Sequence, residues 1–160
     1  MPTPDRDQLL MMDDAQLSGC CQLDFFKATG NGGQKRNKTS SAVRVTLNGY
    51  DLSATDCSER SQHRNREAAL RKLRMLLALT ERRPYQEFER KECSSGHPDF
   101  PLFTARLLDL MAEQAWDYRK AAEVFGCSGT RMLKLLAKAP EVLEYCNCQR
   151  RNSGLPEIHL

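Results

Sequence analysis

The chain has 160 residues, of which 40% are hydrophobic and 28% are charged, a balance that excludes collagen-like, low-complexity and disordered proteins. This length fits one ordinary domain or two small ones, and no apolar run approaches the roughly 20 residues of a membrane-spanning helix. The net charge of +3 divides into −4 over residues 1–26, +8 over residues 27–83 and −1 over residues 84–160. The middle segment is therefore expected to meet a phosphate-rich partner, unless it is simply a basic, solvated surface.

Residues 1–20 form an acidic arm with the wrong charge for a secretory or mitochondrial targeting peptide, which predicts a cytoplasmic protein. The arm is expected either to be disordered or to cover the basic segment while no partner is bound.

The seven cysteines are odd in number and none follows the C-x-x-C spacing of a structural zinc site. Cys93, His97, Cys146 and Cys148 make a four-ligand set only on paper, because closely spaced pairs give strained chelates. Reduced thiols, no metal and no cofactor are therefore expected.

The first elements predict a small α+β domain over residues 21–83. Residues 21–28 favour a strand, residues 29–34 a glycine-rich loop and residues 37–41 a short helical turn. Asn48-Gly49 is typical of a two-residue type I′ hairpin turn. That turn would pair Leu47 with Tyr50, Val45 with Leu52 and Val43 with Ala54.

A helix is predicted to follow the hairpin and to run to about Arg82, with Ser58 or Ser61 as its cap. Its apolar side chains recur at helical spacing and can cover the hairpin; they are Ala69, Leu73, Leu76 and Leu77.

The remainder predicts a linker over residues 84–101 and an all-α unit over residues 102–160. One amphipathic helix is expected to span Phe103 to Met111, and two more are expected within residues 121–136, broken at Gly126, with Ser128 capping the second. A last helix starts near Pro140. The two central helices resemble a helix-turn-helix.

The glycine loop carries the most specific signal. Residues 30–45 read GNGGQKRNKTSSAVRV and residues 60–69 read RSQHRNREAA. These two blocks resemble the peptidyl-tRNA hydrolysis domain of class-I peptide chain release factors and of short ribosome-rescue factors. The family pattern is G-x-G-G-Q, an Asn three residues later, a Ser-Ala-Val-Arg strand, and R-S-Q-x-x-N-R at a helix start. Arg36, where the family usually has Val, is a local departure.

The resemblance implies that Gly32, Gly33 and Gln34 are the catalytic residues. They would enter the large ribosomal subunit and promote attack of water on the ester of peptidyl-tRNA. The loop offers no general base, so catalysis would rest on a placed water and on hydrogen bonds. The family resemblance implies that the backbone N–H of Gln34 binds the developing oxyanion or the leaving tRNA hydroxyl, and that its side chain limits which nucleophile enters. The family also implies a methyltransferase that acts on Gln34.

The basic residues around the loop are expected to contact ribosomal RNA phosphates. They are Lys35, Arg36, Lys38, Arg60, Arg64 and Arg66. The neighbouring polar residues are expected to hold the domain together or to contact sugar and phosphate oxygens, and the structural role is favoured for the amides; they are Asn37, Ser61, Gln62 and Asn65.

The sequence has neither the P-x-T nor the S-P-F tripeptide by which class-I factors read stop codons, so a codon-independent hydrolase is expected. It departs from the short rescue factors in lacking the basic C-terminal tail with which they sense an empty decoding site. The alternative is a non-catalytic ribosome- or RNA-binding factor that uses the helix-turn-helix for interaction. The helical unit is interpreted mainly as a structural bundle, with RNA docking second, and no DNA partner is expected, because Arg131, Lys134 and Lys138 lie among acids.

Overall fold

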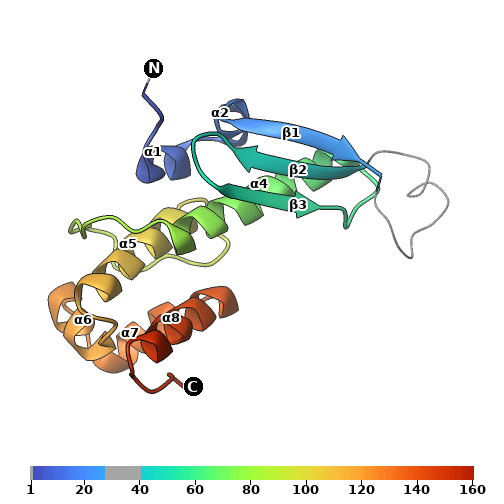
Figure 1. The fold of residues 1–160 in the computed structure, drawn as a ribbon. Coiled ribbons are helices and arrows are strands. Elements are labelled where there is room, and N and C mark those ends of the chain that lie inside the picture. Colours follow the sequence, from blue (N-terminus) through green and yellow to red (C-terminus); the bar gives the residue numbers. More distant parts are fainter. Residues whose placement is uncertain (1, 28–40) are drawn as a thin grey trace. The chain divides into compact units, whose positions relative to one another are not determined.

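The computed structural model describes residues 2–27 and 41–160, and the chain forms two compact units, residues 1–77 and residues 78–160. The first unit combines helices with an antiparallel sheet, which confirms the predicted α+β class (Figure 1). Its elements in order are α1 (Arg6–Met11), α2 (Asp14–Gly19), β1 (Cys21–Phe26), β2 (Ala42–Leu47), β3 (Leu52–Asp56) and α4 (Gln62–Thr80), of which the last three residues belong to the second unit. The second unit is all helical and holds α5 (Phe100–Glu113), α6 (Tyr118–Phe125), α7 (Gly129–Leu136) and α8 (Pro140–Asn152). The domain limits predicted from the sequence remain a prediction.

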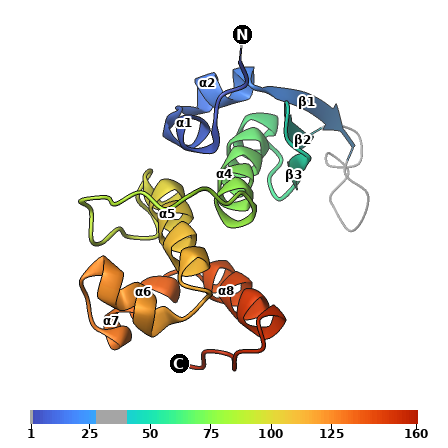
Figure 2. The ribbon, with the colours of Figure 1, turned by 60° about the vertical axis from the view of Figure 1, so that its left-hand side comes forward.

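The sheet of the first unit has β2 in its centre and α4 along one face (Figures 1 and 2). Val43, Val45 and Leu47 of β2 are at most 1% exposed and form the core on that face. The predicted apolar stripe of α4 is buried at Ala69, Leu73 and Leu77 and half-buried at Leu76. Each such side chain withdrawn from water stabilises the unit by about 1–3 kcal/mol, so helix and sheet hold each other.

The predicted hairpin register is wrong by two residues. Leu47 pairs with Leu52, Val45 with Ala54 and Val43 with Asp56, so the turn spans residues 48–51 rather than two residues. Within the turn, Tyr50 donates from its backbone N–H to Leu47 and from its hydroxyl to the Pro4 carbonyl, 3.0 Å away. This contact holds the wider turn, and a shift of two residues leaves each side chain on its predicted face.

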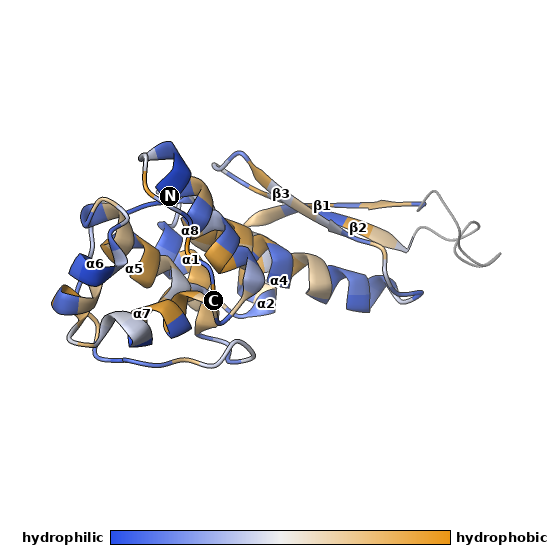
Figure 3. Ribbon diagram, turned by 90° about the horizontal axis from the view of Figure 1, so that it is seen from below, coloured by the Kyte–Doolittle hydropathy of each residue, from blue (hydrophilic) through white to orange (hydrophobic). Residues whose placement is uncertain are grey.

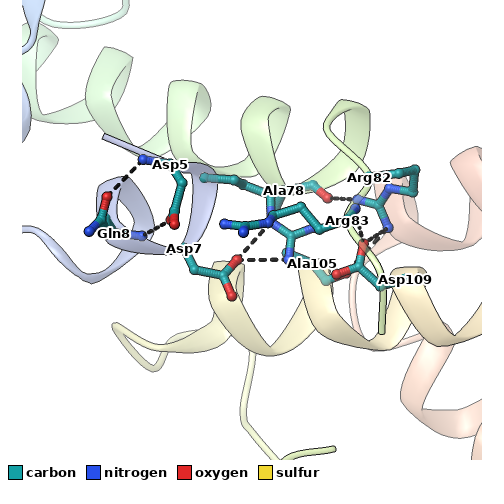
Figure 4. Close-up of polar contacts among 9 residues, drawn as sticks. Asp5, Asp7, Gln8, Ala78, Arg82, Arg83, Ala105 and Asp109 are labelled. Atoms are coloured by element: carbon teal, nitrogen blue, oxygen red, sulfur yellow. Dashed lines mark hydrogen bonds and ion pairs between the residues drawn. The ribbon is translucent and has the colours of Figure 1, made fainter. Parts of the chain in front are cut away.

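The acidic segment forms two short helices and is not disordered. Asp5 accepts from the Gln8 N–H and the Gln8 side chain accepts from the Asp5 N–H, and Asp13 and Gln16 repeat this capping box (Figure 4 draws the first). Leu9, Leu10 and Leu17 are buried. Arg74 of α4 binds Asp14 at 2.5 Å and the Met12 carbonyl at 3.1 Å.

In the second unit, α6 and α7 form the predicted helix-turn-helix. Gly126 takes the left-handed backbone conformation (φ 84°) that ends α6, and Ser128 caps α7 by accepting the Arg131 N–H at 3.1 Å. Met132, Leu135 and Leu136 are buried as predicted, while Leu133 is half-buried.

The segment between α4 and α5 has no helix or strand over residues 81–99, yet it is anchored to the second unit. Phe88 is buried with its ring centroid 5.6 Å from those of Phe103 and Phe125. Buried Asp109 accepts the Arg83 backbone N–H at 3.0 Å and pairs with the Arg82 guanidinium at 3.4 Å (Figure 4). The segment is therefore a packed strap across the helices.

Candidate functional site

The predicted site falls at one end of the first unit. There β1 ends, β2 begins, β3 ends and α4 begins (Figure 1). The predicted catalytic residues Gly32, Gly33 and Gln34 lie outside the described residues, as do Lys35, Arg36, Asn37 and Lys38. The structure does describe Ser41, where the chain returns to β2, and the second sequence block from Arg60 onward.

Asn65 joins these two parts. Its amide nitrogen donates to the Ser41 carbonyl at 2.7 Å and to the Glu59 carbonyl at 2.9 Å, while its side-chain oxygen accepts the Glu59 N–H at 2.9 Å. Asn65 is fully buried, so no water competes for these bonds. The side chain thus fixes the start of β2 against the start of α4, which confirms the structural role expected of this amide.

Two further groups fix the same end of α4. The Ser61 hydroxyl accepts the Arg64 N–H at 3.3 Å and caps the helix, one of the two predicted caps. Ser58 instead donates its N–H and its hydroxyl to Asp56, at 3.0 and 2.6 Å. The chain between β3 and α4 is thereby held at both ends.

Asp56 is a buried carboxylate that sequence reasoning missed. Burial disfavours its charged form, but hydrogen bonds from Lys72 at 2.7 Å and from Ser58 outweigh burial and lower the pKa of Asp56 to about 2. Lys72 lies seven residues after Asn65 and therefore on the same side of α4. This helical spacing is the sequence signal that could have indicated Lys72 as a partner for Asp56.

The three described arginines of the predicted RNA-contacting set lie at this end. Arg60 and Arg64 are exposed, and in the described part of the chain no ion pair holds either. Arg66 is half-buried, and its Nε has no hydrogen-bond partner among the described residues. Figure 3 shows the first turns of α4 as hydrophilic. The geometry therefore offers cations to an anionic partner beside the point where the chain enters β2.

The cysteines do not gather into a metal site. In the described ranges, no group of three or more His, Cys, Asp or Glu residues is placed to hold a metal ion. Cys146 is buried, and burial raises the pKa of its thiol to about 11. Burial together with neighbouring Cys20 raises that of Cys21 to about 11 as well. Both thiols are therefore protonated at neutral pH.

Within the described residues, no helix is long and apolar enough to cross a membrane.

Comparisons with known proteins match the part of the chain that contains this candidate site. The RF-1 domain family matches residues 18–98. Peptide chain release factor 1 of Delftia acidovorans is 40% identical over 94 residues, which cover 59% of this chain and 24% of that protein. Peptide chain release factor 2 of Campylobacter fetus is 34% identical over 100 residues, covering 60% and 26%. Peptide chain release factor 1 of Salinibacter ruber is 44% identical over 72 residues, covering 44% and 19%.

The chain spans about a quarter or less of the length of these relatives. The matched residues contain both sequence blocks, the three-stranded sheet and α4. The chain therefore belongs to the class-I peptide chain release factor family, through an RF-1 domain at residues 18–98.

Proposed function

We propose that this protein is a ribosome-dependent peptidyl-tRNA hydrolase that acts without decoding a stop codon, in the rescue of stalled ribosomes. Its RF-1 domain supports the release-factor chemistry. The codon-independent part stays a prediction from the sequence, and the release assay below tests it. The proposed partner is the large ribosomal subunit with peptidyl-tRNA, which places the proposed work in the cytoplasm.

The proposed reaction is attack of water on the ester that joins the peptide to tRNA. One proton of the water ends on the tRNA hydroxyl that leaves, and the peptide leaves as a carboxylic acid, which loses the second proton to solvent. Gly32 and Gly33 have no Cβ, which lets the backbone approach RNA closely. The backbone N–H of Gln34 stabilises charge that develops on oxygen, a contact worth about 3–4 kcal/mol of barrier. We also propose Gln34 as the substrate of a methyltransferase.

The Asn65 network is the structural observation that carries the proposal. Residues 27–40 separate the end of β1 from Ser41, and Asn65 binds the Ser41 carbonyl. A hydrolytic loop without a general base depends on position, and a loop is positioned through its ends. The buried amide supplies a rigid attachment at one of them.

The exposed arginines supply the second part of the proposed function. Arg60 and Arg64 are exposed at the start of α4, so phosphate contacts made there would hold the domain against ribosomal RNA. Arg66 is the third cation of this set, and Lys35, Arg36 and Lys38 are proposed to extend it along the loop.

Peptide release from purified ribosomes tests this function. Complexes carrying labelled peptidyl-tRNA are prepared with a stop codon, a sense codon or no codon in the decoding site. We expect release in the complex without a codon, and loss of that release in Gly33→Ala with ribosome binding retained. Binding without release in every complex would instead support the non-catalytic ribosome-binding factor.

A further inference from the structure

The helix-turn-helix concentrates the positive charge of the second unit. Residues 117–138 contain five basic and two acidic residues, whereas the rest of residues 78–160 contains seven basic and ten acidic ones. Arg131, Lys134 and Lys138 follow one another at spacings of three and four residues and therefore lie along one side of α7 and its end. This side of the helix is a stripe of cations on an otherwise acidic unit.

One carboxylate bridges two of these cations. Glu92 in the strap accepts from the Arg131 guanidinium at 2.7 Å and from Lys138 Nζ at 3.0 Å. The side-chain hydrogen bonds from Arg131 and Lys138 hold the pKa of Glu92 below its usual range, so an ionised oxygen pair occupies this place. Two cations converging on two oxygens of one anion is also the arrangement that binds a phosphate group.

The strap is fixed on both sides of Glu92 by contacts that do not involve its carboxylate. Lys91 donates to the Phe125 carbonyl at 3.0 Å and lies 4.3 Å from the centre of the Phe125 ring, and Cys93 is 3% exposed. The Glu92 side chain is 55% exposed. Rotation of this one side chain therefore uncovers Arg131 and Lys138 while the strap stays in place.

We propose that Arg131 and Lys138 form a binding site for a backbone phosphate of RNA, and that Glu92 occupies this site in the free protein until RNA replaces it. Lys134 extends the site along the exposed side of α7. In this arrangement the helix-turn-helix is a second, self-covered RNA-binding element, separate from the arginines at the start of α4.

The side chains of α7 favour phosphate contact over base recognition. The helix has no Asn, Gln, Asp or Glu to read adenine or cytosine edges, and its Arg131 converges with Lys138 on one anion, as phosphate binding requires. Duplex RNA is recognised through phosphates, hydroxyls and shape, which suits such a surface. The choice of RNA over DNA rests on the proposed ribosomal function, whereas the phosphate site itself does not.

The test measures affinity of the full-length protein for a fluorescent RNA duplex at low and at physiological salt, with no ribosome present. Glu92→Gln is expected to bind about three- to tenfold more tightly at low salt, with a steeper salt dependence, because an added phosphate contact releases a further counterion. Glu89→Gln is the matched control, since Glu89 is an exposed acid of the same strap that makes none of these contacts. It is expected to change the affinity much less.

Two further variants separate the site from other RNA contacts. The gain is expected to vanish when Arg131→Gln and Lys138→Gln are added to Glu92→Gln, and to persist when Arg60→Gln and Arg64→Gln are added instead. An equal gain in Glu92→Gln and Glu89→Gln would overturn the proposal, because bulk charge would then explain it. No gain at all would overturn it too, and equal or tighter binding of a DNA duplex of the same sequence would overturn the assignment to RNA. Because peptide release is not measured, none of these outcomes depends on the hydrolase activity.

Discussion

The start of α4 and the strap across α7 both hold a polar side chain between two segments, but in opposite environments. Asn65 is fully buried and makes three hydrogen bonds, whereas Glu92 is 55% exposed and makes two ion pairs. Loss of the Asn65 hydrogen bonds leaves a buried polar group without a partner, whereas loss of the Glu92 ion pairs returns the charged groups to water. The buried amide is therefore a structural fixture, and the exposed carboxylate is a contact that a competing anion can replace.

The largest expected effect on stability comes from Asn65→Ala. The substitution removes the buried hydrogen bond to the Ser41 carbonyl and two part-buried ones to the Glu59 backbone, so we expect a loss of about 2–4 kcal/mol in unfolding free energy. Chemical denaturation monitored by circular dichroism measures it. His63→Ala is the control, because the exposed His63–Glu67 pair is worth at most about 0.5 kcal/mol. Equal losses in the two variants would remove the contrast between buried and exposed polar contacts.

Asp109→Ala extends the comparison to the second unit. Asp109 is 1% exposed and receives the Arg83 N–H and the Arg82 guanidinium, so its removal breaks two contacts at a part-buried site. We expect a loss of about 2–3 kcal/mol, measured as a lower melting temperature. A change below about 0.5 kcal/mol would mean that burial alone does not separate strong from weak polar contacts here.

Asp56→Asn is expected to have an intermediate effect that depends on pH. The pKa of Asp56 is about 2 in the folded protein against 3.8 unfolded, so its charge stabilises the fold above pH 3.8 and this contribution disappears as pH falls through about 2. We expect Asp56→Asn to lower the unfolding free energy by about 1–2 kcal/mol at neutral pH. The loss is no larger because Lys72 is half-exposed and water screens the pair. The difference from the native protein should narrow in acid; a difference that widens below pH 4 would contradict the lowered pKa.

Glu92→Gln is expected to have the smallest effect on stability. Both ion pairs of Glu92 lie at the surface, where water and salt screen them, so the unfolding free energy should stay nearly unchanged. The comparison of thermal melts at low and high salt measures this. A loss as large as that of Asn65→Ala would show that the strap depends on Glu92, and the carboxylate would then not be replaceable.

The sequence predicted those elements whose signals are local. Ser61 and Ser128 cap the helices that their positions indicated, Gly126 ends α6, and the apolar spacing of α4 identified the side that meets the sheet. The hairpin register was missed because the sequence preference of Asn48-Gly49 for a two-residue turn is local. The contact between Tyr50 and Pro4 joins residues 46 positions apart, which a local preference does not predict. The strap was missed for a related reason, since Phe88 and Glu92 follow no periodic pattern.

The candidate site divides in the same way. The two sequence blocks located Asn65, Arg60 and Arg64 because their order matches a family pattern, and the structure then supplied the hydrogen bonds of Asn65. The Asp56–Lys72 pair belongs to neither block and depends on packing between β3 and α4. The helices α1 and α2 do have a local signal, the repeated Asp-x-x-Gln of a capping box. It was missed because the acidic segment was interpreted from its net charge alone.

Peptide release from ribosomes with an empty decoding site tests the central claim most directly. The native protein should release labelled peptide without a stop codon, and Gly33→Ala should bind the same ribosomes without releasing it, because an added Cβ keeps the backbone from its close approach. Equal release by Gly33→Ala would contradict the proposed catalytic loop, and release only with a stop codon would contradict codon independence.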